Sequence, residues 1–440
     1  MRLPEEKIKE AILHPDLEIR GRATSYFSRS YSPDPSLMPQ VIKAVETYGK
    51  QDAYHLIGSS RDMQQTEDTI AWVIGELNDP QADQYENYTY NLSMVLVNVE
   101  PALLLPRETA IVEARHFYPA LREPFTERLQ MLSWDMTTCW QRLEEFCEKE
   151  KDKQYVNEVN LGYAGRIVEA LARYGKECEE KVHAILTQRV EDFRNHPMAW
   201  LEPMTVKLAG EAHLESTIPL IVAKLHEEGD LLGQECLQAL TKIGTPEVLH
   251  AIAKAYPTAP AHFRIYASGP LEYIHTDLAV ETCLLLLPQE KDRGLKINLA
   301  HSLLSHFPYE GIEPVRQLLV GQELDFEGRG LRNYLLETCT IMGERIPEHD
   351  EWLATEKAEK EEHRRRVKEL EGDPNGLLLF ALENLAGKKA PETKAKSPRP
   401  AAPRLQFPRK VPEKANVGRN APCPCGSSKK YKNCCMRKGR

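Results

Sequence analysis

Four cysteines near the C-terminus place the strongest constraint on how this chain can fold. They form Cys423-x-Cys425 and, after eight further residues, the adjacent pair Cys434-Cys435. A peptide this short cannot bury enough apolar surface to fold alone, whereas four converging thiolates are typical of a tetrahedral metal site, most often zinc. Because four thiolates leave no coordination position open, we predict a closed, structural zinc site whose metal supplies the folding free energy.

The residues around these cysteines resemble a known family. The stretch GRNAPCPCGSSKKYKNCC, residues 418–435, is similar to the SEC-C motif, the zinc-binding tail of the translocation ATPase SecA that also ends many otherwise unrelated bacterial proteins. The resemblance implies zinc bound by the four cysteines and a tail that acts as an interaction module. In SecA the motif is associated with contacts to a chaperone, phospholipid and the ribosome. Ser428 departs from the family pattern, in which a second glycine is frequent, and no phosphate-binding loop of the motor itself is present.

The remaining six cysteines are scattered singly: Cys139, Cys147, Cys178, Cys236, Cys283 and Cys339. Single thiols on apolar helix faces are typical of buried structural cysteines in a reducing compartment. The first ten residues are charged and lack the apolar core of a signal peptide, and the apolar runs are too short to span a bilayer. We predict a cytoplasmic protein without stable membrane insertion. Free or disulfide-bonded thiols in a secreted protein are the alternative for the terminal cysteines.

Charge is divided unevenly along the chain. Its net charge is −9, but residues 388–440 hold 16 Lys and Arg against two acidic residues, whereas the rest holds 41 against 64. An acidic body with a basic tail indicates that the tail either docks on the body or binds an anionic partner.

The body carries the apolar spacing of helices and no alternating pattern of strands. Within Ala239–Val248, Gly244 is placed to end one helix, Thr245 to cap the next and Pro246 to occupy its first turn. This stretch resembles the hairpin boundary of HEAT-type repeats. Comparable openings recur roughly every 30 to 35 residues, at Ser216–Pro219, Thr276–Asp277 and Gly311–Pro314. We predict an all-α fold, an α-solenoid of HEAT-like helical hairpins.

The composition divides the chain into four predicted segments. Residues 1–346 form the HEAT-like body, and residues 347–387 hold a charged terminal helix, Asp350–Glu371, and a short apolar capping helix, Asn375–Leu385. Residues 388–416 are dominated by Lys, Pro and Ala, which predicts a disordered, basic, Pro-rich linker. Residues 417–440 form the zinc knuckle.

The sequence holds no clear arrangement of catalytic residues. His301 and His306 are five positions apart, off one helical face, and we interpret them as solvated or core histidines. Gly328-Arg329-Gly330 lacks the third glycine of a dinucleotide-binding loop and is interpreted as an ordinary loop. We therefore expect an adaptor and not an enzyme, with a solenoid that binds one protein and a zinc tail that recruits a second. The resemblance implies translocation, chaperone or ribosome components as partners.

Two alternatives stay open. The basic tail suits a ribosome- or nucleic-acid-associated factor, with Lys429, Lys430 and Lys432 contacting phosphate. Tyr431 would stack on a base in that case, or pack on the knuckle. An enzyme on a helical scaffold would instead require a deep pocket with converging polar groups of shifted pKa.

Overall fold

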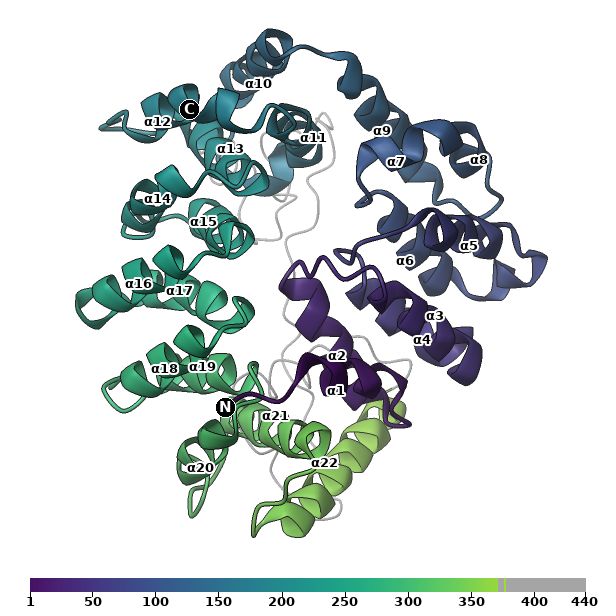
Figure 1. Ribbon diagram of the computed structural model, residues 1–440, viewed down its shortest axis with the longest axis vertical. Coiled ribbons are helices and arrows are strands. Elements are labelled where there is room, and N and C mark those ends of the chain that lie inside the picture. The colour runs from purple at the N-terminus through teal and green to yellow at the C-terminus, as the bar shows by residue number, and fades with distance from the viewer. Residues whose placement is uncertain (371–375, 377–440) are drawn as a thin grey trace, which may run out of the picture. The chain divides into compact units, whose positions relative to one another are not determined.

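The body of the protein is built from helices. A computed structural model describes residues 1–370 and Gly376, and in this part of the chain it contains no strand, only one isolated antiparallel bridge (Figure 1). The chain divides into two units, Met1–Lys388 and Lys389–Arg440. The predicted capping helix Asn375–Leu385, the linker and the zinc knuckle lie outside the described residues. The all-helical body is confirmed, while its HEAT-like type stays a prediction.

The first hundred residues form successive helical hairpins. Its helices are α1 (Glu5–Glu10), α2 (Leu17–Arg29), α3 (Leu37–Tyr48), α4 (Lys50–Ser59), α5 (Glu67–Asn78) and α6 (Glu86–Leu96). The middle of the chain is less regular, with α7 (Pro101–Leu104), α8 (Glu108–Val112), α9 (Pro119–Gln130), α10 (Met136–Glu150), α11 (Leu161–Ala172) and α12 (Glu179–Leu186).

The last ten helices form the most regular part. They are α13 (Met198–Glu211), α14 (Ile218–Lys224), α15 (Asp230–Ile243), α16 (Pro246–Ala255), α17 (Ala261–Tyr273), α18 (Asp277–Leu286), α19 (Arg293–Leu304), α20 (Tyr309–Gln317), α21 (Phe326–Met342) and α22 (His349–Glu369). Between Met1 and Glu369, no helix is both long enough and apolar enough to cross a membrane.

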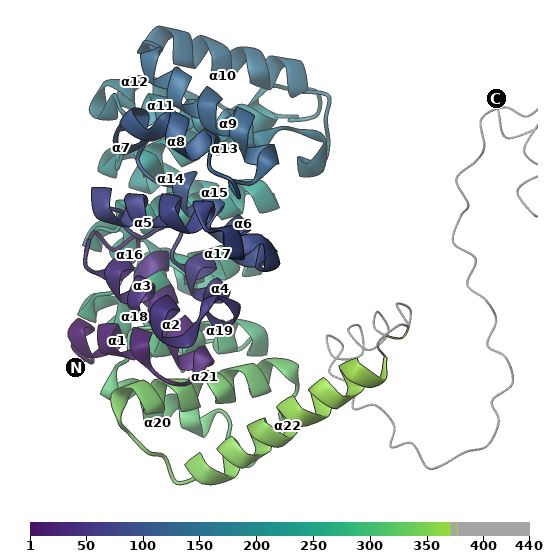
Figure 2. The same ribbon diagram turned by 90° about the vertical axis from the view of Figure 1, so that its right-hand side faces the viewer.

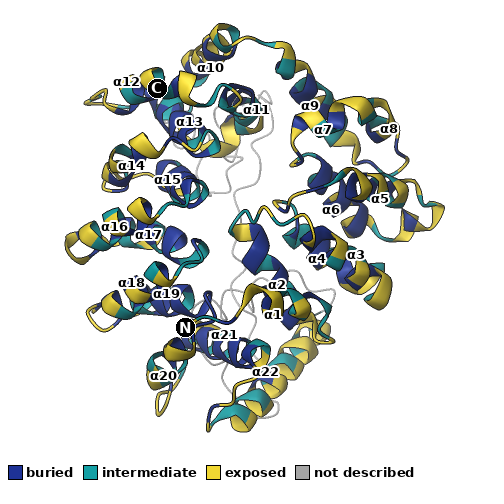
Figure 3. Ribbon diagram, viewed as in Figure 1, coloured by how far each residue is buried: buried dark blue, intermediate teal, exposed yellow. Residues whose placement is uncertain are grey.

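Helices from α13 to α21 alternate between two layers. The layer of α13, α15, α17, α19 and α21 packs helix against neighbouring helix, and α14, α16 and α18 pack in the same way in the other layer. Buried residues face the space between the layers, while much of α22 is exposed (Figure 3). In the perpendicular view, α10 and α12 lie at one end of the stack and α20 and α22 at the other (Figure 2). Each hairpin thus buries its apolar stripe against the next hairpin.

Small residues let the helices of the first layer approach closely. A Cβ atom added to Gly210 of α13 would lie 2.5 Å from the Cα of Ala239 in α15. At Gly269 of α17 it would lie 2.4 Å from the Leu237 side chain. Since backbone cannot yield as a flexible side chain can, Gly210 fixes the spacing between α13 and α15.

The two ends of the helical body meet. The amide of Leu3 donates to the carbonyl of Phe307 at 3.0 Å, and the amide of Tyr309 donates to the carbonyl of Met1 at 3.1 Å. The apolar core forms two clusters. Phe307, in the connection between α19 and α20, and Met342 of α21 belong to the cluster otherwise built from residues Leu3 to Leu129. α2 also packs on α21. The helix series therefore closes on itself within this unit.

Several helix boundaries were predicted correctly and two were wrong. Gly244 ends α15 in the left-handed conformation and Pro246 opens α16, although the Thr245 hydroxyl makes no capping hydrogen bond. Gly311–Pro314 does not open a helix, because α20 begins earlier, at Tyr309. Gly328–Gly330 is no loop: it lies in the first turns of α21, where Asp325 accepts a hydrogen bond from the amide of Gly328 at 2.9 Å and caps the helix.

Candidate functional site

A pocket lies where the helix series closes, between α2 and the helices α17 to α21. We call it the closure pocket; its volume is about 440 Å³. One wall is a single face of α2, formed by Leu17, Glu18, Gly21, Arg22, Ser25, Tyr26 and Arg29. His55 of α4 and residues of α17, α19, α21 and their connections line the rest. The pocket therefore exists only because the first helices pack against the last ones.

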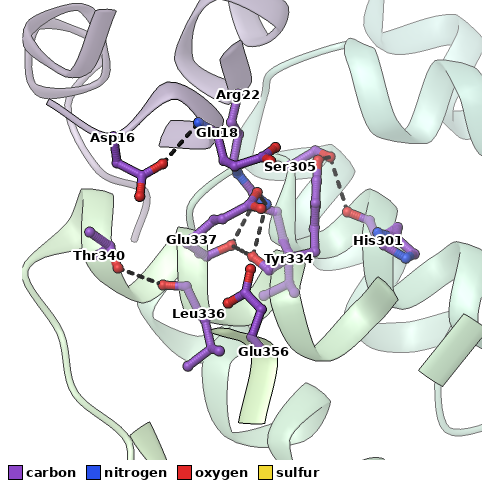
Figure 4. Close-up of polar contacts among 12 residues, drawn as sticks. Asp16, Glu18, Arg22, His301, Ser305, Tyr334, Leu336, Glu337, Thr340 and Glu356 are labelled. Atoms are coloured by element: carbon purple, nitrogen blue, oxygen red, sulfur yellow. Dashed lines mark hydrogen bonds and ion pairs between the residues drawn. The ribbon is translucent and has the colours of Figure 1, made fainter. Parts of the chain in front are cut away.

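Arg22 connects α2 to α19 and α21. Figure 4 shows Arg22 beside Tyr334 and Glu337 of α21. Nη1 of Arg22 donates to the carbonyl of Tyr334 at 2.8 Å, and its Nη2 donates to the carbonyl of Leu304 at 3.1 Å and to Oγ1 of Thr338 at 2.7 Å. The guanidinium carbon lies 3.3 Å from the centroid of the Tyr334 ring. Because Arg22 is only 8% exposed, its charge is held by these contacts and not by water. Both terminal nitrogens of Arg22 are thus committed to closure.

Two carboxylates in the closure pocket accept long, weak hydrogen bonds. Glu337 lies 3.4 Å from Nη1 of Arg22, and Glu272 accepts from Oγ of Ser305, also at 3.4 Å. Burial raises the pKa of Glu337, opposed by Arg22, and raises the pKa of Glu272, opposed chiefly by Arg29. Both groups therefore hold their charge less readily than a solvated carboxylate does.

Arg29 closes another side of the pocket. Its Nη1 donates to the hydroxyl of Tyr273, and its guanidinium carbon lies 5.2 Å from the centroid of that ring. Burial raises the pKa of Tyr273, so the phenol stays protonated. Arg29 is therefore placed against a neutral partner, with the Glu272 carboxylate as the neighbouring negative charge.

A histidine pair joins α2 to the loop after α17. The Nδ1 atoms of His275 and His306 lie 3.2 Å apart, while Nε2 of His275 lies 3.1 Å from the carbonyl of Tyr26 and Nε2 of His306 lies 2.7 Å from that of Leu271. The Tyr26 ring stacks on His275 with centroids 3.8 Å apart. Burial lowers the pKa of both histidines. A carbonyl oxygen only accepts, so both Nε2 atoms must carry a proton, and the contact between the two Nδ1 atoms needs a third. Two neutral rings carry only two such protons.

The residues predicted from the sequence as functional lie outside the described residues. They are the zinc ligands Cys423, Cys425, Cys434 and Cys435 and the partner contacts Lys429, Lys430, Tyr431 and Lys432. Among residues 1–370, no three His, Cys, Asp or Glu side chains gather as a metal site would require. The zinc assignment therefore continues to rest on the sequence of the tail.

The six other cysteines are free and buried, as the sequence predicted: Cys139, Cys147, Cys178, Cys236, Cys283 and Cys339. Burial raises the pKa of the Cys147 thiol to about 12 and that of Cys178 to about 11. These thiols stay protonated at neutral pH and pack as small apolar side chains. His306 is likewise fully buried, in agreement with its interpretation as a core histidine.

The sequence gives little indication of the residues of the closure pocket. Glu18, Arg22, Ser25 and Arg29 recur on one face of α2 at i, i+4, i+7 and i+11, which is the usual pattern of a solvated helix face. Only Arg22 of this face is buried in the structure. The identity of the helices that contact this face, more than 200 positions away in the sequence, carries no local signal.

Comparison with known proteins finds similarity in the tail. The SEC-C motif family matches residues 419–437. The chain is 73% identical over 26 residues to protein translocase subunit SecA 1 of Rhodopirellula baltica and 57% identical over 35 residues to SecA of Wolinella succinogenes. These matches cover 6% and 8% of this chain and only 2% and 4% of the two SecA proteins.

Shorter and more distant matches add little. A UPF0225 protein of Photorhabdus laumondii is 73% identical over 22 residues, 5% of this chain and 14% of that protein. The crystal structure of an engineered protein aligns with 77% of this chain and 99% of its own at 14% identity, with a TM-score of 0.27. The feature that the family model matches is the SEC-C motif at residues 419–437.

Proposed function

We propose that this protein is a non-enzymatic adaptor, in which a helical-repeat body of HEAT-like type binds one protein and a zinc-binding SEC-C tail recruits another. The match of residues 419–437 to the SEC-C motif carries the proposal. Its sequence relatives include translocase subunits, so components of protein translocation are the first partner class to test, with chaperones and ribosomes next. We also propose that the protein acts in the cytoplasm.

Zinc would be held by the four tail cysteines. Four thiolates form a closed tetrahedral set, so the metal would organise the knuckle and leave no position for a substrate. Lys429, Lys430, Tyr431 and Lys432 would then present a basic surface with one aromatic ring to the partner.

The closure pocket supports an adaptor more than an enzyme. Arg22 and Arg29 interact with protein groups on α19, α21 and α17, while His275 of the pocket contacts the buried His306 and the carbonyl of Tyr26. These groups hold helices together. None of them forms the pair of nucleophile and base that most hydrolytic sites require.

An affinity purification from cell lysate tests the proposal. The intact chain is compared with full-length Cys423→Ser/Cys425→Ser and with a chain ending at Gly387. We expect the intact chain alone to retain the recruited partner, and both altered chains to retain the partner of the body. Equal recovery of every partner with all three chains would rule out recruitment by the tail.

The basic tail favours a second candidate, a factor that binds ribosomes or nucleic acid. Residues 388–440 carry 16 basic residues against two acidic ones. Phosphate contacts release counterions, so binding would weaken steeply as salt rises. A complex that persists across a salt titration would favour the protein adaptor.

A further inference from the structure

Three carboxylates line the closure pocket, from Glu18, Glu272 and Glu337, together with the guanidinium groups of Arg22 and Arg29. Glu18 has an ion pair of its own, with Nζ of Lys360 at 3.5 Å. The short hydrogen bonds of Arg22 go to acceptors on α19 and α21, so Glu337 receives only a 3.4 Å contact from it. Within the described residues, neither Glu272 nor Glu337 therefore receives a short hydrogen bond from a cation.

The lack of a close cation shows in the geometry of these two carboxylates. The hydrogen bonds that Ser305 donates to Glu272 and Arg22 donates to Glu337 are each 3.4 Å long, at the outer limit of a hydrogen bond, whereas charge-assisted bonds are usually about 2.7–2.9 Å long. The other hydrogen-bond partner of Glu272 is the neutral hydroxyl of Tyr273. Burial also raises the pKa of both carboxyl groups, which favours their neutral form. A bound cation would supply the short donors that both carboxylates lack.

The walls of the pocket suit an organic cation better than a metal ion. Arg22 and Arg29 already place guanidinium groups over the rings of Tyr334 and Tyr273, so these walls accept a planar cation. A volume of about 440 Å³ falls in the usual range for small-ligand pockets, roughly 300–1,000 Å³. On the α2 side there is open space, because a Cβ atom added at Gly21 would meet nothing within 4 Å.

We infer that the closure pocket binds a compact organic cation, an alkyl guanidinium or primary ammonium group, which donates hydrogen bonds to Glu272 and Glu337. The cation is either a free small molecule or the Arg or Lys side chain of a partner protein. The inference goes beyond the adaptor proposal, because it depends on the helical body and not on the zinc tail.

Calorimetric titration of the full chain with matched pairs of probes tests the inference. Butylguanidine is compared with butylurea, its neutral analogue of nearly the same shape, and a capped Ala-Arg-Ala peptide with the same peptide carrying citrulline. We expect each cation to bind at least ten-fold more tightly than its neutral analogue. Binding of butylguanidine indicates a free ligand, and binding of the arginine peptide alone indicates a partner side chain. Failure of both cations to bind overturns the inference.

Substitutions locate the binding to the pocket. Glu272→Gln and Glu337→Gln keep the shape of the side chain and remove its charge, and each should weaken cation binding at least ten-fold. Gly21→Leu should abolish binding by filling the open space, while leaving every charged group in place. Glu281→Gln, on an exposed position of α18, is the matched control and should bind as the natural chain does.

A folding defect in a glutamine variant would be recognised by circular dichroism. In that case Gly21→Leu tests whether the cation binds in the closure pocket, because leucine has a higher helix propensity than glycine and α2 should remain stable. Cation binding that survives Gly21→Leu and both glutamine substitutions would place the site elsewhere and refute the inference. The tail cysteine variants should bind the cation normally, so cation binding can succeed or fail independently of the adaptor proposal.

Discussion

Replacing Arg22 by methionine should release the closure of the helical body. The substitution removes three hydrogen bonds from a buried cation, each of which contributes about 1.5–3 kcal/mol. The carbonyl acceptors are not left unpaired, because the Tyr334 carbonyl also accepts from Oγ1 of Thr338 and the Leu304 carbonyl from the amide of Phe307. Glu337 loses its 3.4 Å ion pair with Arg22, and its raised pKa lets it take up a proton instead. Methionine also refills most of the apolar volume. We therefore expect a net loss of about 3 kcal/mol, well below the sum of the three bonds.

This loss should be local to the closure. The Arg22 contacts join α2 to helices 282 to 316 positions away, so their removal chiefly favours separation of the N-terminal helices from α19 and α21. A change of 3 kcal/mol corresponds to about a hundred-fold faster hydrogen exchange for the amides that the closure protects. Hydrogen exchange measured by mass spectrometry should show faster exchange in α2 and α21, with α13 and α15 nearly unchanged.

A surface arginine provides the matched control. Arg345 pairs with Asp350, and both side chains are largely exposed, so Arg345→Met should cost less than about 1 kcal/mol. Arg22→Lys keeps the charge but cannot reproduce the planar set of bonds, and its loss should be intermediate. If Arg22→Met unfolds in urea like the natural chain and exchanges at the same rate in α21, the closure does not depend on this residue.

Three further predictions concern other parts of the chain. Gly210→Ala should destabilise the body by about 1–3 kcal/mol in urea unfolding, because its Cβ atom would collide with the backbone of α15. Burial lowers the pKa of His301 to about 4, so the unfolded chain binds more protons below pH 6.5 and stability should fall between about pH 6.5 and 4, by up to ~3 kcal/mol. His301→Gln should remove this share of the pH dependence. Cys423→Ser/Cys425→Ser should abolish stoichiometric zinc in metal analysis and leave the thermal transition of the helical body unchanged.

Each of these has its own control or contrary result. Gly75→Ala, where the added Cβ atom meets nothing within 4 Å, should be neutral or stabilise α5 by about 0.5–1 kcal/mol. An equal loss at Gly75 and Gly210 would point to backbone flexibility and not to close packing. An unaltered pH profile in His301→Gln would show that the ring is accessible to protons in the folded body. A large drop in the melting temperature of the cysteine variant would show that tail and body fold together.

Local sequence signals predicted the helices and several of their ends. Gly244 and Pro246 mark the boundary between α15 and α16, as predicted. Such signals succeed because caps, left-handed glycines and proline act on the residues next to them. They failed at Gly328–Gly330, where the Asp325 cap and the packing of α21 outweigh the low helix propensity of glycine.

The zinc site proposed for the tail likewise follows from the sequence, because four cysteines at fixed spacing would supply the donor set within a few residues. The closure pocket cannot be predicted from the sequence, since it joins Arg22 to Tyr334 across 312 positions. Helical periodicity shows which face of α2 can be buried but not which helix will cover it. That choice depends on the rotation that accumulates from hairpin to hairpin along the stack, which brings α2 and α21 together, and it is a property of the tertiary structure alone.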